Sequence, residues 1–362
     1  MGRGFRDRDY LLTKDDLFFT VIGNAHPDDR VLAYLKYLPS PRGRWRRGAS
    51  RYRRSMRYYS ASNVTRTIDF LHMKYPKYVF RSEPYSTQLS AVPLDAIEYH
   101  FRPDERLRDL RDATQLDSLE RKTIGLASLL SEAGGVSMDR LGVTGSILVD
   151  AHSVRFSDID LVVYGRNESR RVKEALLMLY EREGSGVERL KGKRLWTWCK
   201  EQSIVHPFAI REARALYVRK WNKGVFNNTI FSIHPTKVEE EATERYGEEF
   251  YKPQGIIEAT ARVIDSTDSY FMPAIYTVDD VQFNGLTHLD GVDKVVSFEG
   301  LYADIAEYGE KITVRGKLEQ VLDRAGSLKY QRILVGSSEA RASDYIKVNK
   351  LSKGTRSTKH GD

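Results

Sequence analysis

One stretch, Leu141 to Gly165, constrains the fold of this chain more than any other part of the sequence. It contains two short apolar runs, with Gly145 and Ser146 between them and with Asp158 and Asp160 at the start of the second. Side chains two residues apart point to the same face of a β-strand. The stretch therefore predicts two strands joined through a turn and a short helix, with both carboxylates on one face of the second strand.

These residues suit phosphoryl-transfer chemistry. Two carboxylates held side by side repel each other, and a divalent cation between them removes the repulsion. Gly145 lacks a Cβ, so a phosphate can approach the backbone, while the Ser146 hydroxyl and the free N–H groups of a helix start can hold it. Asp-x-Asp is also common at a solvated strand entry and Gly-Ser in an ordinary turn. Together the two motifs supply the metal ligands and the phosphate-binding bend that a nucleotide site needs.

The order Gly-Ser, eleven intervening residues and Asp-Ile-Asp-Leu resembles the signature of the DNA polymerase β type nucleotidyltransferase superfamily. The chain as a whole is similar to uncharacterised archaeal proteins described as predicted nucleotidyltransferases. The resemblance implies transfer of a nucleoside monophosphate from an NTP, with release of pyrophosphate. It also implies that Asp158 and Asp160 hold Mg²⁺ or Mn²⁺, and that Gly145 and Ser146 contact the triphosphate.

The superfamily carries a third carboxylate on a later strand, and this chain departs from that pattern. The candidate strand, residues 229–234, has Ser232 and His234 where an acid is expected. The third carboxylate is therefore either absent or supplied from elsewhere, with Glu258 and Asp265 as candidates. Two acids can still hold Mg²⁺ with an NTP, because phosphate oxygens complete the coordination. His234 is a candidate general base, with a hydrogen-bonded strand-end histidine as the alternative. The sequence thus leaves open a chain that binds nucleotide without transferring it.

A second feature is a concentration of positive charge near the N-terminus. Residues 42–57 hold eight arginines and no acid, interleaved with Trp45 and Tyr52. Arginine binds phosphate bidentately and aromatic faces stack on bases, so this composition favours RNA or single-stranded DNA as a partner. The alternative is a mobile basic loop that keeps the protein soluble, and its glycines and serines predict that it orders only on contact. The arginines are Arg42, Arg44, Arg46, Arg47, Arg51, Arg53, Arg54 and Arg57.

The chain is long enough for several domains. Its 362 residues exceed one ordinary core, and its net charge of +8 permits a polyanionic partner without requiring one. We predict an α+β fold: a nucleotidyltransferase core, built as a mixed sheet with flanking helices, with an N-terminal α/β region and a small C-terminal antiparallel β-barrel of OB type. The expected boundaries are 1–113 for the N-terminal region, 114–250 for the catalytic domain, 251–336 for the barrel and 337–362 for a disordered basic tail.

The patterns also predict individual elements and a compartment. No apolar run is long enough to cross a bilayer and the start lacks a signal peptide, so we expect a cytoplasmic protein without membrane contact. His152 is a candidate for contact with the triphosphate, or a helix-end histidine. Cys199 is the single cysteine, which excludes an intramolecular disulfide. We expect a hairpin within 16–39, helices over 62–75, 93–101, 114–133 and 167–183, two more helices within 190–223, and a charged connector at 104–112.

Overall fold

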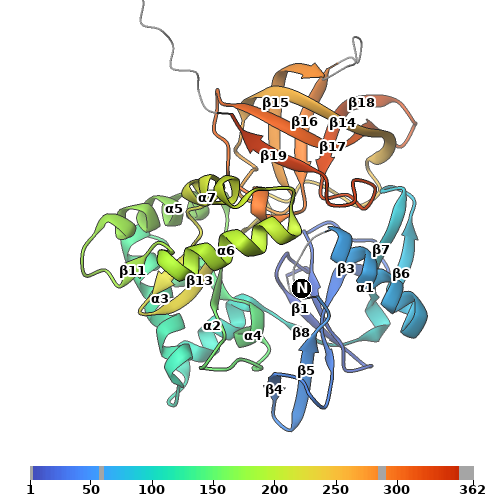
Figure 1. Cartoon of the computed structure of the whole chain (residues 1–362). Coiled ribbons are helices and arrows are strands. Elements are labelled where there is room, and N and C mark those ends of the chain that lie inside the picture. Colours follow the sequence, from blue (N-terminus) through green and yellow to red (C-terminus); the bar gives the residue numbers. More distant parts are fainter. Residues whose placement is uncertain (1–2, 57–60, 284–290, 350–362) are drawn as a thin grey trace, which may run out of the picture.

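The computed structural model describes residues 3–56, 61–283 and 291–349, and this part of the chain is a mixed α+β structure with three sheets and seven α-helices. Figure 1 shows an N-terminal sheet in blue, a middle sheet with green and yellow elements, and a C-terminal sheet in orange and red above both. Among the described residues, no helix combines the length and the apolar character needed to cross a membrane.

The N-terminal sheet has the strand order β4-β5-β3-β2-β1-β8, with β7 and β6 attached through β3. The predicted hairpin is confirmed, since β2 and β3 pair antiparallel. Burial alternates along β3, and its inward face packs with α1 into an apolar core. The bounds are β1 (Tyr10–Thr13), β2 (Phe18–Val21), β3 (Arg30–Pro39), β4 (Trp45–Arg47), β5 (Ser50–Arg54), α1 (Ala61–Lys74), β6 (Val79–Ser82), β7 (Thr87–Pro93) and β8 (Ile97–Phe101).

Two predictions for this region were wrong. The helix expected over 93–101 is largely strand β8, because its residues pair with β1, which lies far away in the sequence. The arginine-rich segment, expected to order only on contact, forms the hairpin of β4 and β5, in which Arg46 pairs with Arg51. Arg57 lies outside the described residues.

The connector expected at 104–112 is a helix, α2 (Pro103–Asp112). Pro103 occupies its first turn, where a missing N–H costs nothing. Leu107 and Leu110 stand three residues apart and are buried in the core of the middle sheet. This core therefore begins before residue 114.

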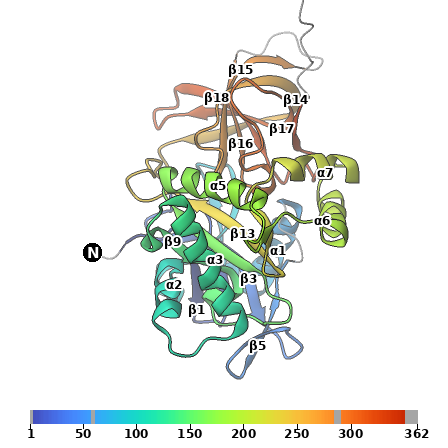
Figure 2. The same cartoon turned by 90° about the vertical axis from the view of Figure 1, so that its left-hand side faces the viewer.

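The middle sheet has the strand order β11-β12-β13-β10-β9. Strand β10 runs parallel to β13 and antiparallel to β9. Figure 2 shows α3 and α5 side by side, and both contribute to the core beneath this sheet. The bounds are α3 (Ser118–Gly134), β9 (Leu141–Val143), α4 (Gly145–Leu148), β10 (Ile159–Tyr164), α5 (Arg166–Glu181), β11 (Val187–Glu188), α6 (Gly192–Val205), α7 (Ile210–Arg219), β12 (Lys223–Phe226) and β13 (Thr229–Thr236).

The C-terminal sheet closes on itself. Strand β14 pairs with both β15 and β17, so the pairing forms a ring in the order β14-β15-β16-β18-β17. The pair of β16 and β18 is parallel, whereas an all-antiparallel barrel was expected. The bounds are β14 (Phe250–Asp265), β15 (Ala274–Phe283), β16 (Val292–Ser297), β17 (Lys311–Leu322), β18 (Leu328–Val335) and β19 (Tyr345–Val348).

Part of the expected disordered tail is ordered. Strand β19 pairs with β17, and Ile346 is buried in the core of the C-terminal sheet. Only Ile346 of this four-residue strand is fully buried, and so short an apolar pattern did not predict a strand in a lysine-rich segment. Residues 350–362 lie outside the described part of the chain.

Ion pairs and ring contacts join the C-terminal sheet to the other two. Arg219 of α7 pairs with Glu310 at 2.7 Å, and the Lys220 ammonium donates to the carbonyl of Ala303 at 2.7 Å. On the other side, the rings of Tyr85 and Tyr251 stack with centroids 5.2 Å apart. Arg219 and Lys220, at the end of α7, therefore serve the junction with the barrel.

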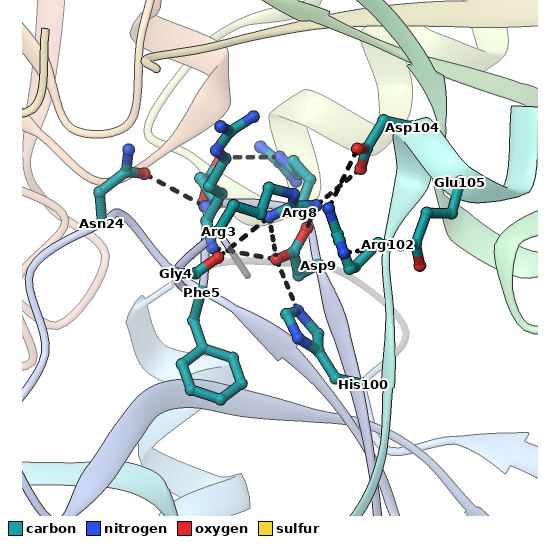
Figure 3. Close-up of polar contacts among 12 residues, drawn as sticks. Arg3, Gly4, Phe5, Arg8, Asp9, Asn24, His100, Arg102, Asp104 and Glu105 are labelled. Atoms are coloured by element: carbon teal, nitrogen blue, oxygen red, sulfur yellow. Dashed lines mark hydrogen bonds and ion pairs between the residues drawn. The ribbon is translucent and has the colours of Figure 1, made fainter. Parts of the chain in front are cut away.

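The N-terminal segment is held by a buried ion network around Asp9 (Figure 3). The Asp9 carboxylate is fully buried and accepts from the Arg3 guanidinium at 2.7 and 2.9 Å and from the His100 ring at 2.7 Å. Arg3 also reaches Asp104 of α2 at 2.8 Å. This network ties the start of the chain to β8 and α2, and so joins the N-terminal and middle sheets.

His26 is half-buried in the connection between β2 and β3, although a histidine in so polar a turn favours a solvated position. Its Nδ1 accepts from the Leu32 N–H at 3.2 Å and its Nε2 lies 3.3 Å from the Phe5 carbonyl, which fixes a neutral ring with the proton on Nε2. Burial lowers the pKa of His26 from 6.5 to about 4.

This lowered pKa predicts a loss of stability in acid. The unfolded chain takes up a proton on His26 near pH 6.5, whereas the folded chain does not until about pH 4. The free energy of unfolding should therefore fall by at most about 2 kcal/mol from this group between about pH 7 and about pH 5. In His26→Gln, which can keep both hydrogen bonds, denaturant titrations should show a smaller fall; an equal fall in both proteins would refute the assignment.

Candidate active site

The Gly145 bend lies directly against Asp160. The Thr144 N–H donates to the Asp160 carbonyl at 2.8 Å, which holds the end of β9 against the start of β10. Gly145 has a left-handed φ of 71°, and a Cβ built there would lie 2.5 Å from Asp160 Oδ2. Only glycine fits this position without displacing the carboxylate. The bend and the acid thus face each other.

Ser146 connects the bend to the loop that carries Asp158. Its side chain is buried, and its hydroxyl donates to the Ser157 hydroxyl at 3.2 Å. Ser157 in turn accepts from the Ser153 N–H at 3.0 Å. These bonds fold the loop after α4 back onto the bend, so Asp158 follows immediately after a residue that contacts Ser146.

The two acids differ in their electrostatics. Asp158 is an exposed residue, yet the protein around its carboxyl excludes enough water to raise its pKa to about 6. The charge of Lys223 lowers this pKa, whereas that of Asp160 raises it. Burial would also raise the pKa of Asp160, but the nearby His234 ring, the hydrogen bond from Ser232 and the charge of Lys223 hold it below its ordinary value. Both carboxyls are largely ionised at neutral pH, as ligands for a divalent ion must be.

The position of the missing third acid is filled by a hydrogen-bonded pair. In the parallel register Asp160 lies beside Ser232, whose hydroxyl donates to Asp160 Oδ1. His234 Nε2 lies 2.9 Å from the Ser232 hydroxyl and 3.7 Å from Asp160 Oδ1. Because Ser232 has only one proton, Nε2 must donate to it and cannot accept a proton there. Burial lowers the pKa of His234 to about 4, so the ring is neutral and positions Asp160 through Ser232.

The substitutes considered for the third acid have partners in the C-terminal sheet. Glu258 accepts from the Tyr345 hydroxyl at 2.9 Å, and Asp265 accepts from the Thr267 hydroxyl at 2.6 Å. A residue that the sequence patterns missed, Glu201 of α6, does act electrostatically on Asp158 and raises its pKa. The third acid was expected on a strand, and no strand pattern marks an acid that lies on a helix.

His152 does not join the two acids. Its Nε2 lies 2.8 Å from Asp117 Oδ2, and Asp117, Glu120 and His152 together form a group of possible metal ligands. Asp117 and Glu120 already form the capping box of α3, and Glu120 also accepts from Arg106. These bonds account for the cluster, which we interpret as the N-terminal cap of α3.

The N-terminal sheet covers the acids with positive charge. Arg8 and Lys36 act on Asp160, and Arg54 acts on Asp158. Burial lowers the pKa of the Lys36 ammonium well below its ordinary value, and the charge of Arg54 lowers it further. Of these cations the sequence singled out only Arg54, because the positions of the other two depend on how separate sheets pack.

The arginine hairpin adjoins the same loop. The Arg44 guanidinium lies 4.5 Å from the centre of the Phe156 ring, and the Trp45 ring packs edge-on against Phe156 at 5.9 Å. Phe156 precedes Asp158 by two residues and is exposed. The hairpin therefore reaches the acids through a loop that carries an accessible aromatic face.

A comparison with known proteins shows the family of the chain. The chain is 30% identical over 351 residues to the uncharacterised protein MJ1086 of Methanocaldococcus jannaschii, which covers 95% of this chain and 99% of that protein. The chain belongs to the family of this archaeal protein. No family model matches the chain, and no solved structure matches it with significance.

Proposed function

We propose that the protein is a Mg²⁺-dependent nucleotidyltransferase that moves a nucleoside monophosphate from an NTP to an RNA or DNA acceptor and releases pyrophosphate. One observation carries the proposal: the left-handed Gly145 bend lies against Asp160, with Asp158 two residues earlier on the same strand entry. A bend without a Cβ beside two ionised acids suits a metal-bound triphosphate.

The residues fit a divalent ion. Asp158 and Asp160 offer the oxygen ligands that Mg²⁺ prefers. Loss of solvent is the main cause of the raised pKa of Asp158, the charge of Asp160 adds to it, and a cation would relieve that repulsion. Such an ion would polarise the transferred phosphoryl group. Ser232 holds one oxygen of Asp160 in place, and backbone N–H groups at the Gly145 bend would bind phosphate.

Two surfaces support a nucleic-acid acceptor. The hairpin of β4 and β5 carries arginines beside the exposed ring of Phe156, next to Asp158. The C-terminal ring of five strands with one parallel pair supports the proposed OB type, a barrel that often binds single strands. We propose that the hairpin holds the acceptor strand near the acids and that the barrel extends this surface.

The proposal is tested by incubating the protein with NTPs labelled at the α-phosphate, Mg²⁺ or Mn²⁺, and separate pools of tRNA, single-stranded DNA, protein and small molecules. Wild type should label a nucleic acid, and Asp158→Ala/Asp160→Ala should label nothing. Asp139→Ala, which removes an exposed acid from the same region, is the control and should retain labelling. Label on protein or small molecules alone would keep the transferase and overturn the acceptor.

A second candidate is a nucleic-acid-binding protein with an impaired transferase site. The observation in its favour is that Ser232 and His234 stand where a third acid would help to activate the acceptor. It predicts no labelling of any acceptor, together with salt-sensitive binding of RNA or DNA that survives Asp158→Ala/Asp160→Ala. Labelling that depends on both acids would exclude it.

A further inference from the structure

Arg8, in the turn before β1, and Lys36 and Arg54, in the N-terminal sheet, act on the two acids, and only Arg54 belongs to the arginine hairpin. We propose that Arg8, Lys36 and Arg54, with Lys223 of β12, bind the polyphosphate of the nucleotide, so that the nucleotide lies between the N-terminal and middle sheets. This inference rests on the proposed function and adds the N-terminal sheet as a second side of the nucleotide site.

Arg8 is placed by an unusual backbone. Its φ of 73° is left-handed, which is uncommon for a residue with a side chain and costs about 1 to 2 kcal/mol. The Arg8 carbonyl accepts from the Thr144 hydroxyl at 2.8 Å, beside the Gly145 bend. The strained residue is thus fixed to the bend that faces Asp160, and its charge acts on both Asp160 and His234.

Lys36 is placed by a β-bulge. Phe18 pairs with Tyr37 and Phe19 pairs with Leu35, so Lys36 is the additional residue that has no counterpart on β2. Bulges redirect a side chain and are frequent next to active sites. On the other side of β3, Arg54 pairs with Tyr37, which brings the second cation alongside.

The side of the site that carries these cations is fixed to the bend. Tyr10 and Tyr37 of the N-terminal sheet share one apolar cluster with Leu148 and Val149, which end and follow α4. Since this cluster is buried, the sheet cannot move away from α4 without exposing it. Lys223 approaches from the other side, because it pairs directly with Ser232, the residue that holds Asp160.

The convergence of the cations favours a compact polyanion. Arg8, Lys36, Arg54 and Lys223 all act on the two acids. Asp7 also pairs with Arg8 at 3.2 Å and Glu201 acts on Asp158, so the site carries charges of both signs. The other hairpin arginines are spread over two strands and suit the backbone of a single-stranded nucleic acid, whereas these four cations converge on the acids. A triphosphate concentrates its charge in the same way, and the Gly145 bend opposite offers backbone N–H groups to the same ligand.

The test is calorimetric titration with inorganic tripolyphosphate in EDTA, so that no metal or transfer is involved. Lys36→Gln/Arg54→Gln should weaken binding at least about tenfold, as expected for lost charge-assisted bonds. Arg66→Gln/Arg81→Gln, which removes two exposed charges from the same region, should change it less than about twofold. Arg54→Gln alone, at an exposed side chain, should also weaken binding and guards against misfolding at the bulge.

The outcomes separate this inference from the proposed function. Asp158→Asn/Asp160→Asn should bind tripolyphosphate as well as wild type or more tightly, because two repelling charges are gone. Tripolyphosphate binding that needs these cations, with no nucleotidyl transfer, would leave the inference standing and end the transferase proposal. Equal weakening in the control pair would overturn the inference. So would an effect of Lys36→Gln/Arg54→Gln on a single-stranded oligonucleotide but none on tripolyphosphate.

Discussion

Gly145→Ala should lower the rate of nucleotidyl transfer at least about a hundredfold while the protein stays folded. A methyl group at this position would lie 2.5 Å from Asp160 Oδ2, and the carboxylate cannot turn freely because Ser232 holds its other oxygen. The acid must therefore shift, and a shift of about 1 Å at a reacting centre costs a rate of this size. Mn²⁺ affinity, measured by titration, should fall with it.

Gly135→Ala is the matched control for this change. Gly135, at the end of α3, is also left-handed with a φ of 59°, but a Cβ there meets nothing within 4 Å. Both variants carry a similar backbone strain of about 1 kcal/mol, and only Gly145→Ala displaces an acid. If Gly145→Ala binds Mn²⁺ as tightly as Gly135→Ala does, the bend does not support the acid as we describe.

Asp9→Asn should lower the free energy of unfolding by about 3 to 5 kcal/mol. Asp9 is fully buried and balances Arg3, whose side chain is 8% exposed, while also accepting from His100. Asparagine removes the negative charge at the centre of the network and leaves the buried guanidinium with Asp104 as its remaining counter-charge, and removing one partner is the costly way to break a buried ion pair. Denaturant titration, with urea midpoints and slopes for both proteins, measures the loss.

Two comparisons isolate the cause of that loss. Asp29→Asn breaks the exposed pair with Arg30, which is equally short at 2.6 Å, and should cost at most about 1 kcal/mol. Arg3→Gln/Asp9→Asn removes both charges of the buried pair, so it should cost less than the sum of the two single changes. Additive losses would show that the charges do not depend on each other.

Sequence patterns predicted most accurately the helices and strands whose defining residues lie close together in the sequence. A short apolar run that starts at Asp158 and Asp160 predicts a strand, and the structure has strand β10 at Ile159–Tyr164. Apolar residues at helical spacing, with glycines beyond them, predict α5. In both cases the burial that forms the element follows from residues within one short window.

The elements that were missed depend on partners distant in the sequence or on a weak local signal. The residues of β8 follow a proline and suggest a helix by themselves, and only pairing with β1 makes them a strand. The charges of α2 conceal a helix, although Leu107 and Leu110 carry its buried face. Propensity is a weak guide when tertiary contacts decide.

The residues of the candidate site also differ in whether a local pattern predicts them. Gly145, Ser146, Asp158 and Asp160 stand in one stretch, so their chemistry is visible in the sequence without their geometry. Arg8 and Lys36 owe their places to a left-handed residue and a bulge in another sheet, which no local pattern marks. The functional roles of both sets remain predictions for the experiments above.

The apolar cluster shared by the N-terminal sheet and the α4 segment limits how this protein can be dissected. A shortened chain that begins at α2 would leave Leu148, Val149 and Ala151 without the tyrosines that cover them. Such a fragment would carry a bare apolar patch beside its own acids and would tend to aggregate. Biochemical work on the two aspartates therefore needs the first hundred or so residues of the chain in place.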